Sequence, residues 1–222
     1  MTDLATREAG DPLCLPPERT GELLAGAPWR RFAVLGDSLA AGVLDPPVEG
    51  YAPVSWPDRV AAGLRRVHPD LAYRNLGRRG LLTRQVRETQ LDAALEFGPD
   101  LATLVCGGND LLVPRLDRAA VEADIDAMVA ALTAAGATVF VFGLMNVTAA
   151  TTKMDLLKPR LMGLNASVRK VAGRHGAVFV DLWPHPAAAD RDLYSGDLLH
   201  MSARGHAHIA AATVTALAAA GS

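Results

Sequence analysis

Short apolar runs alternate along the chain with longer stretches in which apolar residues recur every three or four positions. That recurrence places the apolar side chains on one face of an α-helix, whereas a short unbroken apolar run is typical of a buried strand. We therefore predict strands over the ranges 31–36, 71–76, 101–105, 138–142 and 177–181. The intervening and following stretches predict helices over 56–68, 82–96, 118–135, 160–174 and 202–219.

The apolar runs are continuous and do not alternate with polar residues. The run 101–105, for example, contains no charged side chain. Strands of this kind are buried on both faces, as in a parallel sheet whose crossover helices cover both of its sides. The pattern therefore predicts an α/β fold, a three-layer αβα sandwich with a five-stranded parallel sheet.

The start of the chain differs from the remainder. Residues 1–29 carry prolines among charged side chains, at Pro12, Pro16, Pro17 and Pro28. We expect this segment to be an irregular N-terminal leader that either wraps the domain or is partly disordered. Residues 30–222 are expected to form a single domain, because a chain of 222 residues that is 50% hydrophobic can build one sizeable core.

Composition excludes several functional classes. The formal net charge is −2 and the pI is about 6.3, so the chain has no electrostatic footprint for nucleic acid. Charged residues interrupt the apolar stretches well short of the roughly 20 residues that a membrane span needs. No secretory signal is visible, and Cys14 and Cys106 are expected to be free thiols. We therefore expect a cytoplasmic protein; the oligomeric state stays open.

Polar residues and glycines follow the ends of several predicted strands. Gly36, Asp37 and Ser38 follow the first strand, and glycine permits the sharp turn that would present Ser38 at the rim of the sheet. Gly80 follows the second strand, Asn109 the third, and Asp197 with His200 the fifth. The carboxyl ends of parallel strands meet at one edge of a sheet, where ligands bind. Taken singly, Ser38 also suits a helix cap and Asn109 a turn.

Together these residues can perform acyl transfer. Ser38 would attack an acyl carbonyl, His200 would accept its proton, and Asp197 would orient and stabilise the imidazole. The oxyanion needs preorganised donors, which the backbone N–H groups of Ser38 and Gly80 and the side-chain amide of Asn109 can supply.

Four segments, in order, resemble the conserved blocks of the SGNH (GDSL) hydrolase superfamily. They are Gly36-Asp37-Ser38-Leu39, Asn75 through Gly80, Gly107-Gly108-Asn109-Asp110, and Asp197-Leu198-Leu199-His200. The resemblance extends from about Arg31 to the end of the chain. It implies a flavodoxin-like sheet and esterase, lipase, thioesterase or deacetylase activity on a small-molecule ester or thioester, with no metal or cofactor. It also implies a triad of Ser38, Asp197 and His200, with Ser38, Gly80 and Asn109 forming the oxyanion hole.

The second block departs from the commoner form, because Arg78 and Arg79 stand where small hydroxyl residues are frequent. Two glycines compete for the donor role. We prefer Gly80, since the superfamily's donor lies five positions after the asparagine, and keep Gly77 as the alternative. A guanidinium from Arg78 or Arg79 could also bind an anionic substrate group, although loop arginines are usually exposed.

A hydrolytic metal site is the alternative chemistry, with His200, His206, His208 and Asp197 as ligands. His206 and His208 lie two positions apart on a predicted helix and so point to different faces, which disfavours it.

Two alternatives to a hydrolase also stay open, namely an acyltransferase and a catalytically silent binding domain. The sequence does not define the acyl group or the leaving group. Apolar side chains follow the motif strands and are candidates for an acyl pocket as well as for the core: Leu39, Val43, Leu111, Leu112, Val113, Leu144 and Met145. The stretch 144–158 suits either a lid or a long connection.

Overall fold

The structure, a computed structural model, describes residues 6–43 and 47–220 of the chain. Within these residues, a parallel sheet of five strands lies at the centre of the protein. The strands are β1 (Arg31–Gly36), β2 (Ala72–Asn75), β3 (Leu101–Val105), β4 (Thr138–Gly143) and β5 (Val178–Asp181), in the order β2-β1-β3-β4-β5. All four pairings are parallel. The predicted five-stranded parallel sheet is confirmed.

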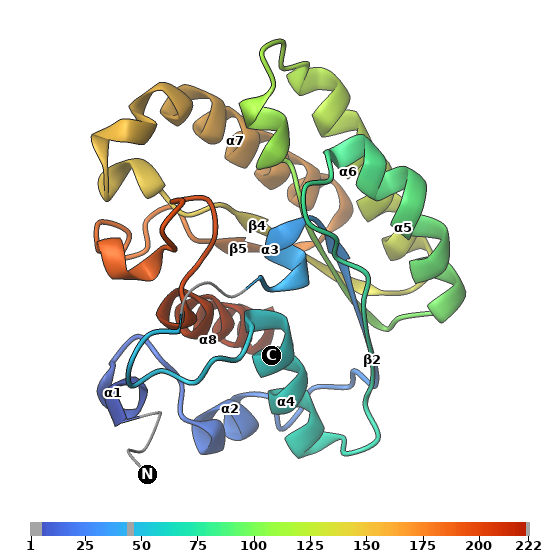
Figure 1. The fold of residues 1–222 in the computed structure, drawn as a ribbon. Coiled ribbons are helices and arrows are strands. Elements are labelled where there is room, and N and C mark those ends of the chain that lie inside the picture. The colour runs from blue at the N-terminus through green and yellow to red at the C-terminus, as the bar shows by residue number, and fades with distance from the viewer. Residues whose placement is uncertain (1–5, 44–46, 221–222) are drawn as a thin grey trace.

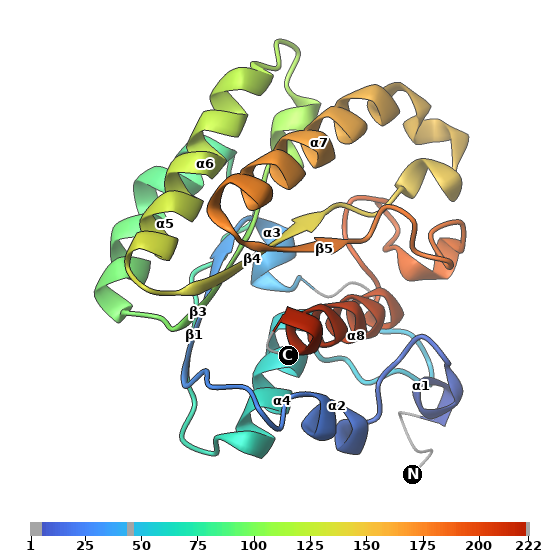
Figure 2. The same cartoon turned by 180° about the vertical axis from the view of Figure 1, so that it is seen from behind.

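Helices cover both faces of this sheet (Figures 1 and 2). Helices α5 (Thr83–Phe97), α6 (Arg118–Ala134) and α7 (Lys158–His175) lie on one face, and α4 (Trp56–Val67) and α8 (Ala203–Ala220) lie on the other. Neighbouring residues of one strand enter opposite cores: Phe32 belongs to the core that includes residues of α4 and α8, whereas Ala33 belongs to the core that includes residues of α5, α6 and α7. Burial on both faces explains why the strand sequences are continuously apolar.

The expectation of an irregular leader is wrong over two short helices, α1 (Thr6–Gly10) and α2 (Pro17–Leu23). Pro17 stands in the first turn of α2, where its missing N–H costs nothing. The segment is held against the domain because Leu24 is buried in the core beside α4, and Glu8 forms an ion pair with Arg59 at 2.5 Å. Of the two alternatives for this segment, the described residues from Thr6 onward pack against the domain, but their apolar positions were too few to predict the two helices from the sequence. The division of the chain at residue 30 stays a prediction.

The shorter elements lie between the strands and the main helices. They are α3 (Ser38–Ala41) and the 3-10 helices η1 (Asn109–Leu112), η2 (Val147–Ala149), η3 (Thr152–Leu157) and η4 (Arg191–Leu193). Each follows the carboxyl end of a strand, so these pieces collect at the sheet edge where the candidate residues were expected. Among the described residues, no helix has the length and apolar character needed to cross a membrane.

Candidate active site

Ser38 is the first residue of α3, immediately after the turn that ends β1. Gly36 adopts a φ of 141°, and a Cβ added to it would lie 1.9 Å from the carbonyl oxygen of Val105. Only glycine fits there, which explains the glycine of the first motif. Asp37 caps α3 by accepting a hydrogen bond of 2.9 Å from the Leu39 N–H.

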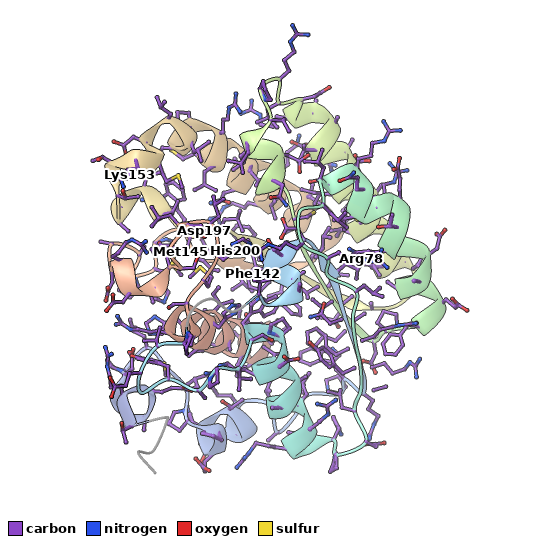
Figure 3. The ribbon with its side chains drawn as sticks, viewed as in Figure 1. Arg78, Phe142, Met145, Lys153, Asp197 and His200 are labelled. Atoms are coloured by element: carbon purple, nitrogen blue, oxygen red, sulfur yellow. The ribbon has the colours of Figure 1, made fainter. Side chains whose placement is uncertain are left out.

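The structure brings Ser38, His200 and Asp197 into a hydrogen-bonded chain. His200 Nε2 lies 2.8 Å from Ser38 Oγ, and His200 Nδ1 lies 2.6 Å from Asp197 Oδ2. A carboxylate at Nδ1 favours the tautomer that carries its proton on Nδ1, which leaves Nε2 free to accept from the serine hydroxyl. Figure 3 shows Asp197 and His200 next to each other near the start of α3.

The loop that carries Asp197 and His200 is closed on itself. Tyr194 and Met201 form an antiparallel bridge, and the Ser195 N–H donates to the His200 carbonyl at 2.9 Å. Leu198 adopts a φ of 62°, a left-handed conformation that is uncommon for leucine. This turn brings the side chains of Asp197 and His200 within hydrogen-bonding distance of each other.

Asp197 accepts more hydrogen bonds than the sequence indicated. Its Oδ1 accepts from Ser195 Oγ at 2.5 Å and from the Leu199 and His200 N–H groups at 2.9 and 3.0 Å. Burial raises the pKa of this carboxyl, but these bonds and that from the His200 ring outweigh burial and hold the pKa well below its ordinary value. Asp197 is therefore ionised at neutral pH. Our sequence reasoning missed Ser195, whose only signal was its position two residues before the aspartate.

Asn109 begins η1, and its side chain reaches the segment that follows β2. Asn109 Nδ2 donates to the Leu81 carbonyl at 2.9 Å. Asp110 accepts from the Thr83 N–H and from Thr83 Oγ1, both at 2.9 Å, which ties the same motif to the start of α5. The third motif is thus fixed to the residues that directly follow the second motif.

The two glycines that compete as oxyanion donors differ in their surroundings. The Gly77 N–H donates to Asn75 Oδ1 at 2.9 Å, and a Cβ on Gly77 would lie 2.4 Å from the Ala41 nitrogen. Gly77 is therefore a packing glycine beside α3 whose N–H is already engaged. Gly80 adopts a φ of 81°, is exposed, and is not among the described residues that line the cavity beside Ser38.

A cavity of about 120 Å³ opens beside Ser38, Asn109 and His200. Most of its other lining residues are apolar: Leu39, Leu111, Leu112, Leu144, Met145, Val147, Leu157, Leu161, Leu198, Leu199 and Met201. Of the seven expected pocket residues, five line it; Val43 and Val113 are outside the described lining. The stretch 144–158 forms one wall through Met145, Val147 and Leu157.

Several candidate residues lie apart from this cavity. Arg78 and Arg79 are exposed and are not part of the described lining, and Figure 3 shows Arg78 well away from Asp197 and His200. The four residues of the alternative metal site are not assembled among the described residues. His206 Nδ1 accepts from the Trp56 N–H at 3.1 Å, whereas His208 Nε2 contacts Asp11 Oδ2 at 2.8 Å.

Among the described residues, a different set brings potential metal-ligand atoms close together: Asp11, Cys14 and His208. Asp11 Oδ2 already accepts hydrogen bonds from Tyr51, Arg204 and His208, at 2.6, 3.1 and 2.8 Å. The positive charge of Arg204 at this oxygen opposes a cation there.

Comparison with known proteins gives a family match over most of the chain. The model of the GDSL-like lipase/acylhydrolase family matches residues 34–208, a range that includes Ser38, Gly80, Asn109, Asp197 and His200. A search of curated proteins finds no match.

Solved structures share the fold at low sequence identity. LAE5, an alpha/beta hydrolase enzyme from the metagenome of Lake Arreo, is 19% identical, with a TM-score of 0.70 over 85% of this chain and 94% of its own. The lipase/acylhydrolase from Enterococcus faecalis is 22% identical, with a TM-score of 0.68 over 86% and 96%. Axe2, an acetylxylan esterase from Geobacillus stearothermophilus, is 19% identical, with a TM-score of 0.68 over 85% and 94%.

Proposed function

The chain belongs to the GDSL-like lipase/acylhydrolase family and is an ester hydrolase of that family, and from this membership we propose that it cleaves carboxylic esters or thioesters through an acyl-enzyme on Ser38. The observation that carries the proposal is the continuous hydrogen-bonded chain from Ser38 Oγ through the His200 ring to Asp197.

In the first half-reaction, Ser38 Oγ attacks the acyl carbonyl as its proton passes to His200 Nε2. The imidazolium then gives that proton to the leaving oxygen or sulfur, and the bond between the acyl carbon and the leaving group breaks. In the second half-reaction, water attacks the acyl-enzyme, His200 takes the water proton, and the acid leaves as Ser38 regains its hydroxyl.

Three donors are proposed for the oxyanion that forms at each tetrahedral step. They are the Ser38 N–H, the Gly80 N–H and the Asn109 side-chain amide. The engagement of the Gly77 N–H by Asn75 favours Gly80 over Gly77, whereas the place of Gly80 outside the described cavity lining counts against it. The position of Asn109 in the cavity lining beside Ser38 supports its role.

The cavity supports an aliphatic acyl group as the part of the substrate bound beside Ser38. Apart from Asp37 and His200, the described lining contains no Asp, Glu, Lys, Arg or His side chain, and most of it is leucine, methionine and valine. Transfer of apolar surface out of water therefore drives binding. A substrate carboxylate bound by Arg78 or Arg79 has no support, because both arginines lie outside that lining. A cytoplasmic location stays a prediction.

A compact fluorophosphonate and a series of 4-nitrophenyl esters and matching thioesters test the proposal. The wild type is expected to be labelled on Ser38 and to release 4-nitrophenol, whereas Ser38→Ala should do neither. An unlabelled wild type with a native circular dichroism spectrum would favour a silent binding domain. Product analysis with an added alcohol or amine separates hydrolysis from acyl transfer to that nucleophile.

A further inference from the structure

Gln90 of α5 makes a pair of hydrogen bonds to a single residue of the nucleophile turn. The Gly36 N–H donates to Gln90 Oε1 at 2.8 Å, and Gln90 Nε2 donates to the Gly36 carbonyl at 2.9 Å. Gln90 is only 2% exposed. One buried side chain therefore satisfies both backbone groups of the residue that lies two positions before Ser38.

The end of the sheet explains why Gly36 needs this partner. β2 ends at Asn75, and beyond it the Leu76 and Arg78 N–H groups donate to the Val34 and Gly36 carbonyls at 2.8 and 3.1 Å. The N–H and C=O of one strand residue point to the same side, so the Gly36 N–H faces this segment as well. There the amide oxygen of Gln90 takes the place of a strand carbonyl. An unpaired buried N–H would otherwise cost free energy.

The Gly36 carbonyl joins two parts of the site. It accepts from Gln90 and from the Arg78 N–H, and Arg78 lies in the segment that leads to Gly80. On its other side, the turn is fixed to β3 by the bond of 3.2 Å from the Asp37 N–H to the Val105 carbonyl. The position of Ser38 relative to the Gly80 segment thus depends on a junction to which Gln90 contributes two bonds.

We propose that Gln90 is a positioning residue for the reaction: its side-chain amide fixes the Gly36 turn, and through it the alignment of Ser38 with the oxyanion donors. The proposal rests on the proposed function of Ser38. Gln90 does not line the cavity within the described residues, so its removal should change the reactivity of the serine and not the binding of the acyl group.

The chain offers a matched comparison in Asn165 of α7. Its amide makes the same pair of bonds to one backbone residue after β4: the Leu144 N–H donates to Asn165 Oδ1 at 2.8 Å, and Asn165 Nδ2 donates to the Leu144 carbonyl at 2.9 Å. Asn165 is also buried. Leu144, however, lines the cavity wall and does not lead into the serine turn. The two amides therefore make the same kind of contact, but Gln90 holds the turn before Ser38 and Asn165 holds a residue of the cavity wall.

The experiment compares Gln90→Met and Asn165→Leu, which remove the polar pair at nearly constant size. The rate of labelling by a compact fluorophosphonate measures the reactivity of Ser38, and kcat and KM are measured on 4-nitrophenyl butyrate. Gln90→Met is expected to lower the labelling rate and kcat by about 10- to 100-fold with little change in KM, because small misplacements of reacting groups cost this much. Asn165→Leu is expected to raise KM and to leave the labelling rate near that of the wild type. Thermal unfolding of both variants shows whether they are equally destabilised.

Labelling of Gln90→Met at the wild-type rate would overturn the proposal, and so would an equal loss of labelling in a folded Asn165→Leu. If Gln90→Met does not fold, Gln90→Glu is used instead. A buried carboxyl tends to stay neutral, and it then keeps an acceptor for the Gly36 N–H and an O–H donor for its carbonyl. Its labelling rate should lie close to that of the wild type, and a loss as large as that of Ser38→Ala would contradict the proposal. Failure of the wild type to label would contradict the proposed function of Ser38 and with it the role of Gln90, whereas wild-type labelling rates in both the wild type and Gln90→Met would contradict the role of Gln90 alone.

Discussion

His200 Nε2 lies 2.8 Å from Ser38 Oγ, although 162 positions separate the two residues in the chain. The serine is held by the turn after β1, and the histidine by a closed loop between β5 and α8. The turn and the loop are separate parts of the fold, so the distance between Nε2 and Oγ depends on how the sheet places them relative to each other. Asp197 Oδ2 fixes the imidazole at Nδ1, and Asp197 Oδ1 in turn accepts from Ser195 Oγ and from two backbone N–H groups.

Asp197→Asn should lower kcat by about 10³- to 10⁴-fold, because an amide at this position no longer favours the tautomer with its proton on Nδ1. KM should change little, since Asp197 does not line the cavity within the described residues. Steady-state kinetics on 4-nitrophenyl butyrate measure both constants. Ser195→Ala, which removes one of several bonds to Asp197, serves as the milder comparison. A kcat of Asp197→Asn no lower than that of Ser195→Ala would contradict the assignment.

Asn109→Ala should lower kcat by about 10²- to 10³-fold, the usual cost of losing one oxyanion donor. The same substitution removes the bond to the Leu81 carbonyl, which is a structural role. Asn109→Asp keeps the shape of the side chain but has no N–H to donate, so it should lose as much activity as the alanine variant. A small effect in both variants, with the native fold retained, would leave the oxyanion to backbone donors alone.

Asp37 should make the stability of the protein depend on pH. Burial raises the pKa of its carboxyl to about 7, and the neighbouring charge of Asp110 adds to this, while the Leu39 N–H opposes it. The unfolded chain releases this proton near pH 4, roughly its model value. Between about pH 4 and pH 7 the folded state therefore binds more protons, and this group lowers the free energy of unfolding as pH rises.

Asp37→Asn has no such proton to lose. Its free energy of unfolding relative to that of the wild type should increase as pH rises through this window, and the difference should stay constant at higher pH. Urea unfolding at several pH values measures the difference. Asp92→Asn, on the exposed side of α5, is the control. A difference for Asp37→Asn that does not vary with pH would show that the folded carboxyl titrates normally.

Leu161→Trp should shift the preference of the enzyme toward short acyl groups, because Leu161 lines the cavity and a larger side chain fills part of its volume. We expect the ratio of kcat/KM for 4-nitrophenyl octanoate to that for the acetate to fall by about tenfold or more. Met162→Trp is the matched control, since Met162 is the next residue of α7, is 52% exposed and is not part of the described lining. Equal ratios in the two variants would place the acyl group elsewhere.

Much of the fold and the position of the site follow from local patterns. A buried strand needs apolar residues on both faces and a helix needs an apolar stripe, so the strand 101–105 and the helix predicted over 118–135 are recognisable from the sequence wherever their partners lie. Ser38, Asn109 and His200 could likewise be predicted as candidate site residues, because each follows a strand whose end must reach the same edge of a parallel sheet. The short leader helices were not, since α1 and α2 are stabilised by contacts to α4 and α8 and not by a strong pattern of their own.

The sequence by itself therefore determined the layers, the strand ends and the place of Ser38, Asn109 and His200 at the sheet edge, since these depend on periodicity and residue type over a few positions. Only the tertiary structure decided which polar side chains bind which distant backbone groups: Gln90 those of Gly36, Asn165 those of Leu144 and Asn109 that of Leu81. A hydrogen bond requires its two atoms to lie within about 3 Å of each other. Whether a side chain on a helix reaches a given backbone group depends on how that helix is seated on the sheet, which no short stretch of sequence encodes.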